Sequence, residues 1–137
     1  MCLNIYIGSK KILPAIKVDE SNSGFYLKEV INTEQDYPFI KDLLSADFLY
    51  SASSYLGCAC GLASGKEYID DDHDLRVRDL NAMFNYLNLN LPNNQIKIFC
   101  TWWEIFKDNH EMEDFSLQLV NSEAFEFKED IILNVKF

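Results

Sequence analysis

The sequence predicts an α+β domain in which a single, largely antiparallel sheet of about five or six strands carries two helices packed on one face. Three observations lead to this prediction. Several segments alternate apolar and polar side chains, one segment repeats apolar residues every three or four positions, and 137 residues at 48% hydrophobic can bury one core. Neither a repeat of fixed period nor a linker divides the chain, so we expect residues 1–137 to form one globular domain.

The first half of the chain predicts three strands and a short helix. The strands are expected at residues 2–8, 25–31 and 47–55. In the first of them Leu3, Ile5 and Ile7 alternate with polar neighbours, which is typical of a strand with one buried face. The helix is expected at residues 38–45, because Pro38 fits a helix only in its first turn.

The second half of the chain predicts one long helix and three more strands. The helix covers residues 71–89, where four apolar side chains recur on one face: Leu80, Met83, Phe84 and Leu87. The strands are expected at residues 95–106, 115–120 and 131–137. Residues 108–114 are expected to form a polar loop. The strand that follows the helix is apolar on both faces, which favours a central position in the sheet.

Acidic residues outnumber basic ones, 22 to 12, and the surplus is concentrated in two segments. Residues 67–74 have a net charge of -5 and residues 108–130 of -7, while the rest of the chain carries +2. Because the Lys and Arg residues are scattered, the sequence argues against binding to nucleic acid or to an anionic membrane. An acidic surface favours fast, salt-sensitive association with a basic protein. The alternative explanation is that the surplus of acidic residues only keeps a small domain soluble.

This charge asymmetry, without a nucleophile, phosphate or dinucleotide motif, predicts a small binding module of the immunity or inhibitor kind that faces a cationic toxin or nuclease. The expected partner-binding residues are seven carboxylates and one aromatic anchor: Asp70, Asp71, Asp72, Asp74, Trp103, Glu111, Glu113 and Asp114. For residues 70–74 the alternative is capping of the long helix. A weaker alternative is acid–base chemistry by Glu104 and His110; no catalytic residue is assigned.

The four cysteines suggest a second function class. Cys100 is expected to be a buried structural thiol. Cys58 and Cys60 stand in Gly-Cys-Ala-Cys-Gly, where two thiols on one side of a strand suit a soft metal such as zinc. The remaining ligands would be Cys2 and either His73 or His110. A redox dithiol, or a tight glycine-flanked bend of small side chains, explains the same pattern.

Two segments carry a resemblance to known proteins. Residues 1–9 with Leu13 and Pro14, together with residues 55–61, resemble small bacterial proteins of uncharacterised function that have an N-terminal Met-Cys strand and a Gly-Cys-x-Cys-Gly segment. The resemblance implies no activity, but it makes Cys2, Cys58 and Cys60 a plausible shared site. The N-terminal segment predicts a strand and not a signal peptide, and no apolar run approaches the length of a membrane span, so we expect a cytoplasmic protein.

Overall fold

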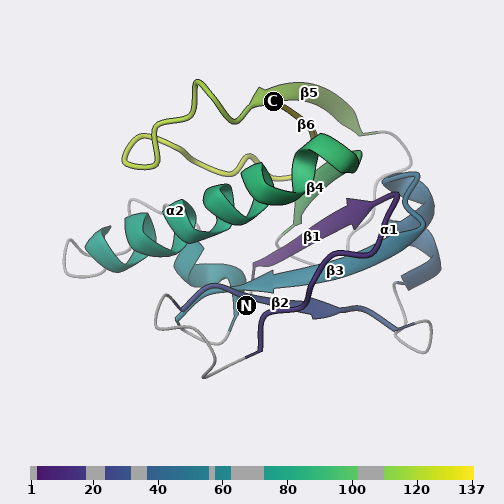
Figure 1. The fold of residues 1–137 in the computed structure, drawn as a ribbon, viewed down its shortest axis with the longest axis horizontal. Coiled ribbons are helices and arrows are strands. Elements are labelled where there is room, and N and C mark those ends of the chain that lie inside the picture. The colour runs from purple at the N-terminus through teal and green to yellow at the C-terminus, as the bar shows by residue number, and fades with distance from the viewer. Residues whose placement is uncertain (1–2, 18–23, 32–36, 56–57, 63–72, 102–109) are drawn as a thin grey trace.

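The computed structural model describes residues 3–17, 24–31, 37–55, 58–62, 73–101 and 110–137. Within these residues six strands form one open sheet in the order β2-β3-β1-β4-β6-β5 (Figure 1). The strands are β1 (Asn4–Ser9), β2 (Tyr26–Glu29), β3 (Phe48–Ser53), β4 (Ile96–Thr101), β5 (Glu111–Ser116) and β6 (Ile131–Lys136). The helices are α1 (Tyr37–Leu43), α2 (His73–Asn90) and the short 3-10 helices η1 (Ala59–Leu62) and η3 (Leu91–Asn93). The α+β class is confirmed.

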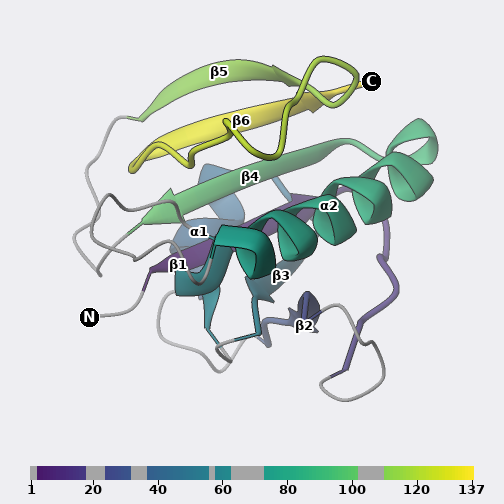
Figure 2. The same ribbon diagram turned by 90° about the vertical axis from the view of Figure 1, so that its left-hand side faces the viewer.

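The sheet is mixed and not antiparallel throughout. The difference from the expected, largely antiparallel sheet lies at one edge. Strand β1 pairs antiparallel with β3 and β4, β2 with β3, and β6 with β4. Strand β5 instead runs parallel to β6. A parallel neighbour requires a long crossover connection, and residues 117–130 provide it by returning across the sheet to the end where β5 began (Figure 2).

The two α-helices lie on opposite faces of the sheet, not on one face as the sequence suggested (Figure 2). On one face, four residues of α2 pack against β1 and β4: Leu80, Met83, Phe84 and Leu87. On the other face, Ile40 of α1 belongs to a second cluster with Phe99 of β4. Adjacent residues of a strand point to opposite faces, so the apolar neighbours Ile98 and Phe99 both need cover. The central position expected for this strand is confirmed.

The segment expected to be a polar loop is in large part the edge strand β5, at Glu111–Ser116 instead of 115–120. Three of its six residues are exposed and none is buried, so it has no alternation of buried and exposed positions from which a strand could be predicted. The long helix is confirmed as α2, although residues 70–72 lie outside the described part. No helix among the described residues is both long and apolar enough to cross a membrane.

Candidate functional site

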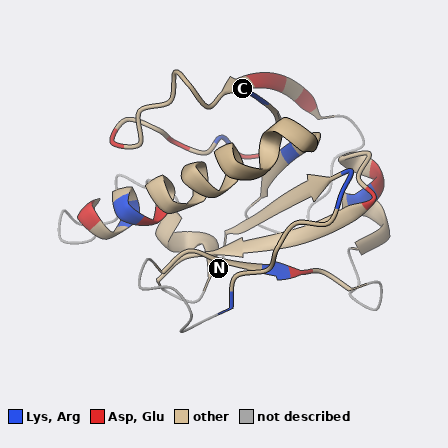
Figure 3. Cartoon of the chain, viewed as in Figure 1, with Lys and Arg blue, Asp and Glu red and all other residues tan. Residues whose placement is uncertain are grey.

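Three of the predicted partner-binding residues come together on β5, and we call Glu111, Glu113 and Asp114 the acidic edge. Glu111 and Asp114 are exposed and Glu113 is half-exposed. Figure 3 shows this strand at the margin of the sheet, with acidic positions on both sides of one uncharged position. Residues 110–137 hold seven carboxylates and two lysines, a net charge of -5. The edge therefore presents several negative charges on one extended element.

Two neighbours orient these carboxylates. The Lys128 ammonium lies 3.2 Å and 3.3 Å from the two carboxylate oxygens of Glu113, and the Asn134 amide donates to Asp114 Oδ1 at 3.2 Å. The ion pair is exposed on both sides, and exposed pairs contribute little free energy because water and salt screen them. Lys128 thus orients one carboxylate and leaves the acidic edge negative.

An aromatic cluster anchors β5 to the core. Phe125, in the crossover, has its ring centroid 5.2 Å from that of Phe115 in β5 and 5.3 Å from that of Phe84 in α2. Such tilted and edge-on pairs add to the free energy of burial. The largely buried guanidinium of Arg76 donates to the carbonyl oxygens of Phe125 at 3.0 Å and Glu123 at 3.4 Å. The strand that carries the carboxylates is consequently held against the core by Phe115.

Of the other predicted partner-binding residues the structure describes Asp74, which does not join the acidic edge. Asp74 is exposed in the first turn of α2, at the end of the helix that lies away from β5 in Figure 3. This position also fits the capping alternative, since a carboxylate there meets the positive end of the helix dipole. Residues 70–72 and Trp103 lie outside the described residues.

The segment that holds Cys58 and Cys60 is a tight bend and not a strand; we call residues 58–62 with Ser54 the cysteine corner. The Ser54 hydroxyl donates to the Cys58 carbonyl at 2.7 Å and accepts the Gly61 N–H at 3.1 Å. A Cβ atom on Gly61 would clash with Ser54, whose Cβ would be 2.8 Å away. The glycine is needed because the two chain segments approach so closely. This geometry supports the bend explanation of Gly-Cys-Ala-Cys-Gly.

The predicted metal ligands do not form a complete site in the part of the chain that the structure describes. There, no three His, Cys, Asp or Glu side chains are grouped in a way that could hold a metal ion. His73 is exposed at the start of α2. His110 packs its ring against Phe99, and its Nδ1 lies 3.1 Å from the Asp130 carbonyl oxygen. Because a carbonyl oxygen only accepts, Nδ1 is the donor in this contact.

The sulfur atoms themselves differ in their surroundings. Cys60 is buried, and its Sγ accepts the Leu3 N–H at 3.3 Å. Leu3 follows Cys2 in the chain, but Cys2 lies outside the described residues. Cys58 is half-exposed. Cys100 is buried in β4 as expected, and burial raises the pKa of its thiol to about 12, which keeps it protonated and unreactive.

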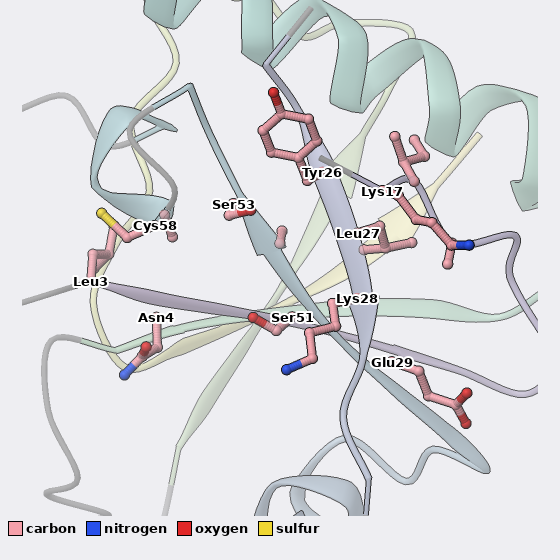
Figure 4. Close-up of a pocket in the computed structure, with 14 residues that line it drawn as sticks. Leu3, Asn4, Lys17, Tyr26, Leu27, Lys28, Glu29, Ser51, Ser53 and Cys58 are labelled. Carbon is pink, nitrogen blue, oxygen red and sulfur yellow. The ribbon is translucent and has the colours of Figure 1, made fainter. Parts of the chain in front are cut away.

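Beside the cysteine corner the structure has a pocket of about 570 Å³ that no pattern in the sequence predicts (Figure 4). Leu3, Leu27, Ala52 and Ala59 contribute buried apolar side chains, and Asn4, Lys28, Ser51, Ser53 and Cys58 contribute polar groups. The polar residues come from β1, β2, β3 and the corner, segments far apart in the sequence. Their only local signal is the alternation that places Ser51 and Ser53 on one face of β3.

The two candidate sites therefore offer different chemistry. The acidic edge provides a strand with negative side chains and no described strand on its outer side. The cysteine corner provides a tight bend with one half-exposed thiol next to a small pocket. Comparison of the chain with protein-family models, with curated proteins and with solved structures found no match.

Proposed function

We propose that this protein is a small binding module that uses the acidic edge to engage a basic segment of a partner protein. The observation that supports the proposal is the position of three carboxylates on one exposed strand at the margin of the sheet. Complementary charge accelerates association and selects against partners of the same sign. The protein's net charge of -10 adds to the attraction of any cationic partner.

The spacing of the carboxylates favours joint action on one basic segment. Side chains two positions apart on a strand lie on the same face about 7 Å apart, which applies to Glu111 and Glu113. This distance is shorter than the screening length of about 8 Å at physiological ionic strength, so both charges act on the same cation. Met112, between them in sequence, is 51% exposed and offers an apolar contact beside the charges.

The proposed role is that of an immunity-like or inhibitor-like protein that covers a cationic surface, in the cytoplasm. Trp103 stays the proposed aromatic anchor, because a large ring beside charged groups is typical of the centre of protein interfaces. Glu123, Glu126 and Glu129 are exposed carboxylates from the same half of the chain and serve as the comparison set for the acidic edge.

The test uses a defined cationic probe, the peptide acetyl-Lys-Val-Lys-Lys-Val-Lys-amide, and measures its binding at low and at physiological salt. The variant E111Q/E113Q/D114N removes the acidic edge, and E123Q/E126Q/E129Q removes three charges elsewhere. We expect the first variant to bind about tenfold more weakly at low salt and the second to lose about twofold through net charge alone. Equal losses in the two variants, or no binding by the unmodified protein, would overturn the proposal.

One contact favours a second candidate function, a thiol or zinc site formed by Cys58 and Cys60 with Cys2. The contact is the hydrogen bond from the Leu3 N–H to Cys60 Sγ, because it brings the residue that follows Cys2 up to the sulfur of the corner. Three thiolates are a suitable soft donor set for zinc, and a histidine such as His73 or His110 would be the fourth ligand.

Elemental analysis of protein purified without chelator tests this second function. We expect one zinc per chain that is lost in C58S/C60S and retained in C100A, because Cys100 is buried in β4. Metal-free protein whose Cys58 reacts with thiol reagents at an ordinary rate would remove both the zinc and the activated-thiol explanations.

A further inference from the structure

We infer that the basic partner binds as an additional β-strand along β5, an inference that rests on the proposed function and specifies its geometry. In this arrangement main-chain hydrogen bonds hold the partner and the carboxylates select its charge. The inference depends on three features of β5: the direction of its peptide groups, the absence of a described neighbour on its outer side, and the sign of its side chains.

The register of the β5·β6 ladder shows which peptide groups face outward. In a parallel pair, alternate residues of each strand direct both their N–H and C=O groups to the partner. The Leu117 N–H donates to the Lys136 carbonyl at 2.9 Å, so Leu117, Phe115 and Glu113 direct their peptide groups to β6. Met112 and Asp114 therefore direct theirs to the outer side of the sheet.

No other strand among the described residues pairs with this outer side, and Figure 2 shows β5 as the outermost described element there. The crossover does not return along this side, because it packs its aromatic residues against α2. It does close one end, where the Leu119 N–H donates to the Ser116 carbonyl at 3.3 Å. In the described part of the chain, the stretch without a covering neighbour thus runs from Glu111 to Asp114, long enough for a short extended segment.

The side chains define the sequence of that segment. Residues directly opposite each other in a ladder share a face and interact, with opposite charges stabilising the pair. Opposite Glu111, Met112, Glu113 and Asp114 the partner is expected to place a basic, an apolar, a basic and a basic residue in turn. The probe peptide presents this pattern in either strand direction, because its sequence is the same when reversed.

A second copy of this chain does not fit the edge. Pairing of β5 with another β5 would place Glu111, Glu113 and Asp114 of each chain close to the same carboxylates of the other. Like charges in opposing positions destabilise a ladder, and natural proteins use such charges to keep sheet edges from pairing with one another. The same carboxylates that exclude a second copy attract a cationic strand.

The experiment compares two peptides of equal charge and length by binding and by hydrogen exchange. The first is acetyl-Lys-Val-Lys-Lys-Val-Lys-amide. In the second, acetyl-Lys-Pro-Lys-Lys-Pro-Lys-amide, proline removes donors and disfavours a strand without changing the charge. We expect the second peptide to bind about tenfold more weakly. The first should slow exchange of the Met112 and Asp114 amides and leave those of Glu113 and Phe115, already bonded to β6, unchanged.

Each outcome has a distinct meaning. Equal affinity for both peptides, without protection of the Met112 and Asp114 amides, would overturn strand addition, while the proposed function would stand if binding still required the acidic edge. Loss of binding in E111Q/E113Q/D114N with retained protection in the unmodified protein supports both. Failure of both peptides to bind at low salt would overturn both.

Discussion

The two edges of the sheet are protected in different ways. At one edge, β2 has four residues, and its Leu27 exchanges both main-chain hydrogen bonds with Ile16 at 3.0 Å, so the chain covers this edge itself. At the other edge, β5 has six residues and meets no further described strand, but carries carboxylates. Short strands, added cover and charge are alternative ways of preventing unwanted pairing. Of the two edges, as the described residues show them, the charged one has no covering strand and is open to a partner of opposite sign.

The polar contacts near the two edges differ in burial as well. Near β2, the Tyr50 hydroxyl accepts the Leu13 N–H at 2.7 Å in the interior, and Asp79 is completely buried while it binds the Tyr55 N–H and Arg78. Near β5, the pair between Lys128 and Glu113 is exposed. Since buried polar contacts are costly to break and exposed ones are not, side chains can change at β5 with little effect on the fold.

The largest effect is expected near β2, from D79A. The variant leaves the Tyr55 N–H without its acceptor and removes a charged hydrogen-bond partner from the interior, so we expect unfolding free energy to fall by about 3 kcal/mol. Urea denaturation measures this. D79N retains an oxygen and should lose less, and D74A, on the exposed first turn of α2, should lose at most about 1 kcal/mol. A similar loss in D79A and D74A would contradict the expectation that the buried carboxylate contributes more to stability than the exposed one.

A smaller effect is expected where β5 is anchored, from F125A. The half-buried ring contacts Phe84, Phe115 and Phe127, and its removal should lower the unfolding free energy by about 2 kcal/mol, less than for a fully buried ring. The same urea experiment on L119A, where the side chain is 86% exposed, should show almost no change. If F125A were equally neutral, the aromatic cluster would not be what fixes β5.

The centre of the sheet, unlike its edges, holds a buried thiol whose ionisation should make the stability of the protein depend on alkaline pH. Burial raises the pKa of the Cys100 thiol from 9.0 to about 12, so above pH 9 the unfolded chain releases this proton while the native protein keeps it. The stabilisation is complete below pH 9 and is lost as the pH rises toward 12, by up to about 1.4 kcal/mol per pH unit. The unfolding free energy, measured by urea denaturation at several pH values between 9 and 12, should therefore fall less steeply with pH in C100A than in the unmodified protein. Parallel slopes would mean that this thiol ionises normally.

The smallest effect is expected at the acidic edge itself, from K128A. Loss of an exposed ion pair should change the unfolding free energy by less than about 0.5 kcal/mol. Because Glu113 loses its neighbouring cation, the probe peptide should bind more tightly than it does to K136A, a variant with the same change in net charge. Weaker peptide binding by K128A would show that Lys128 is needed to position the carboxylate.

Local patterns predicted those parts of the structure that depend on burial. The alternation of Leu3, Ile5 and Ile7 predicted β1, and the apolar spacing in residues 71–89 predicted α2. Residues 111–114 of strand β5 were assigned to a loop, because an exposed edge strand is held by main-chain bonds to β6 and not by a buried side-chain pattern. Its parallel direction depends on the path of the crossover, which no local pattern encodes.

The sites were predictable to a different extent. Charge counting identified Glu111, Glu113 and Asp114, but not that they share an uncovered strand. The cysteine pair was expected in a strand, whereas contact between Gly61 and Ser54 makes it a bend. The pocket could not be anticipated, since its walls come from strands that are adjacent only after the sheet has formed.

The order of the strands also bears on how the protein is made. Strand β6 follows β5 in the chain but lies between β4 and β5 in the sheet. During synthesis, β1, β3 and β4 can pair as they emerge, while β5 has no strand to join until the ribosome has released β6. The acidic strand can therefore join the sheet only after β6 has been made.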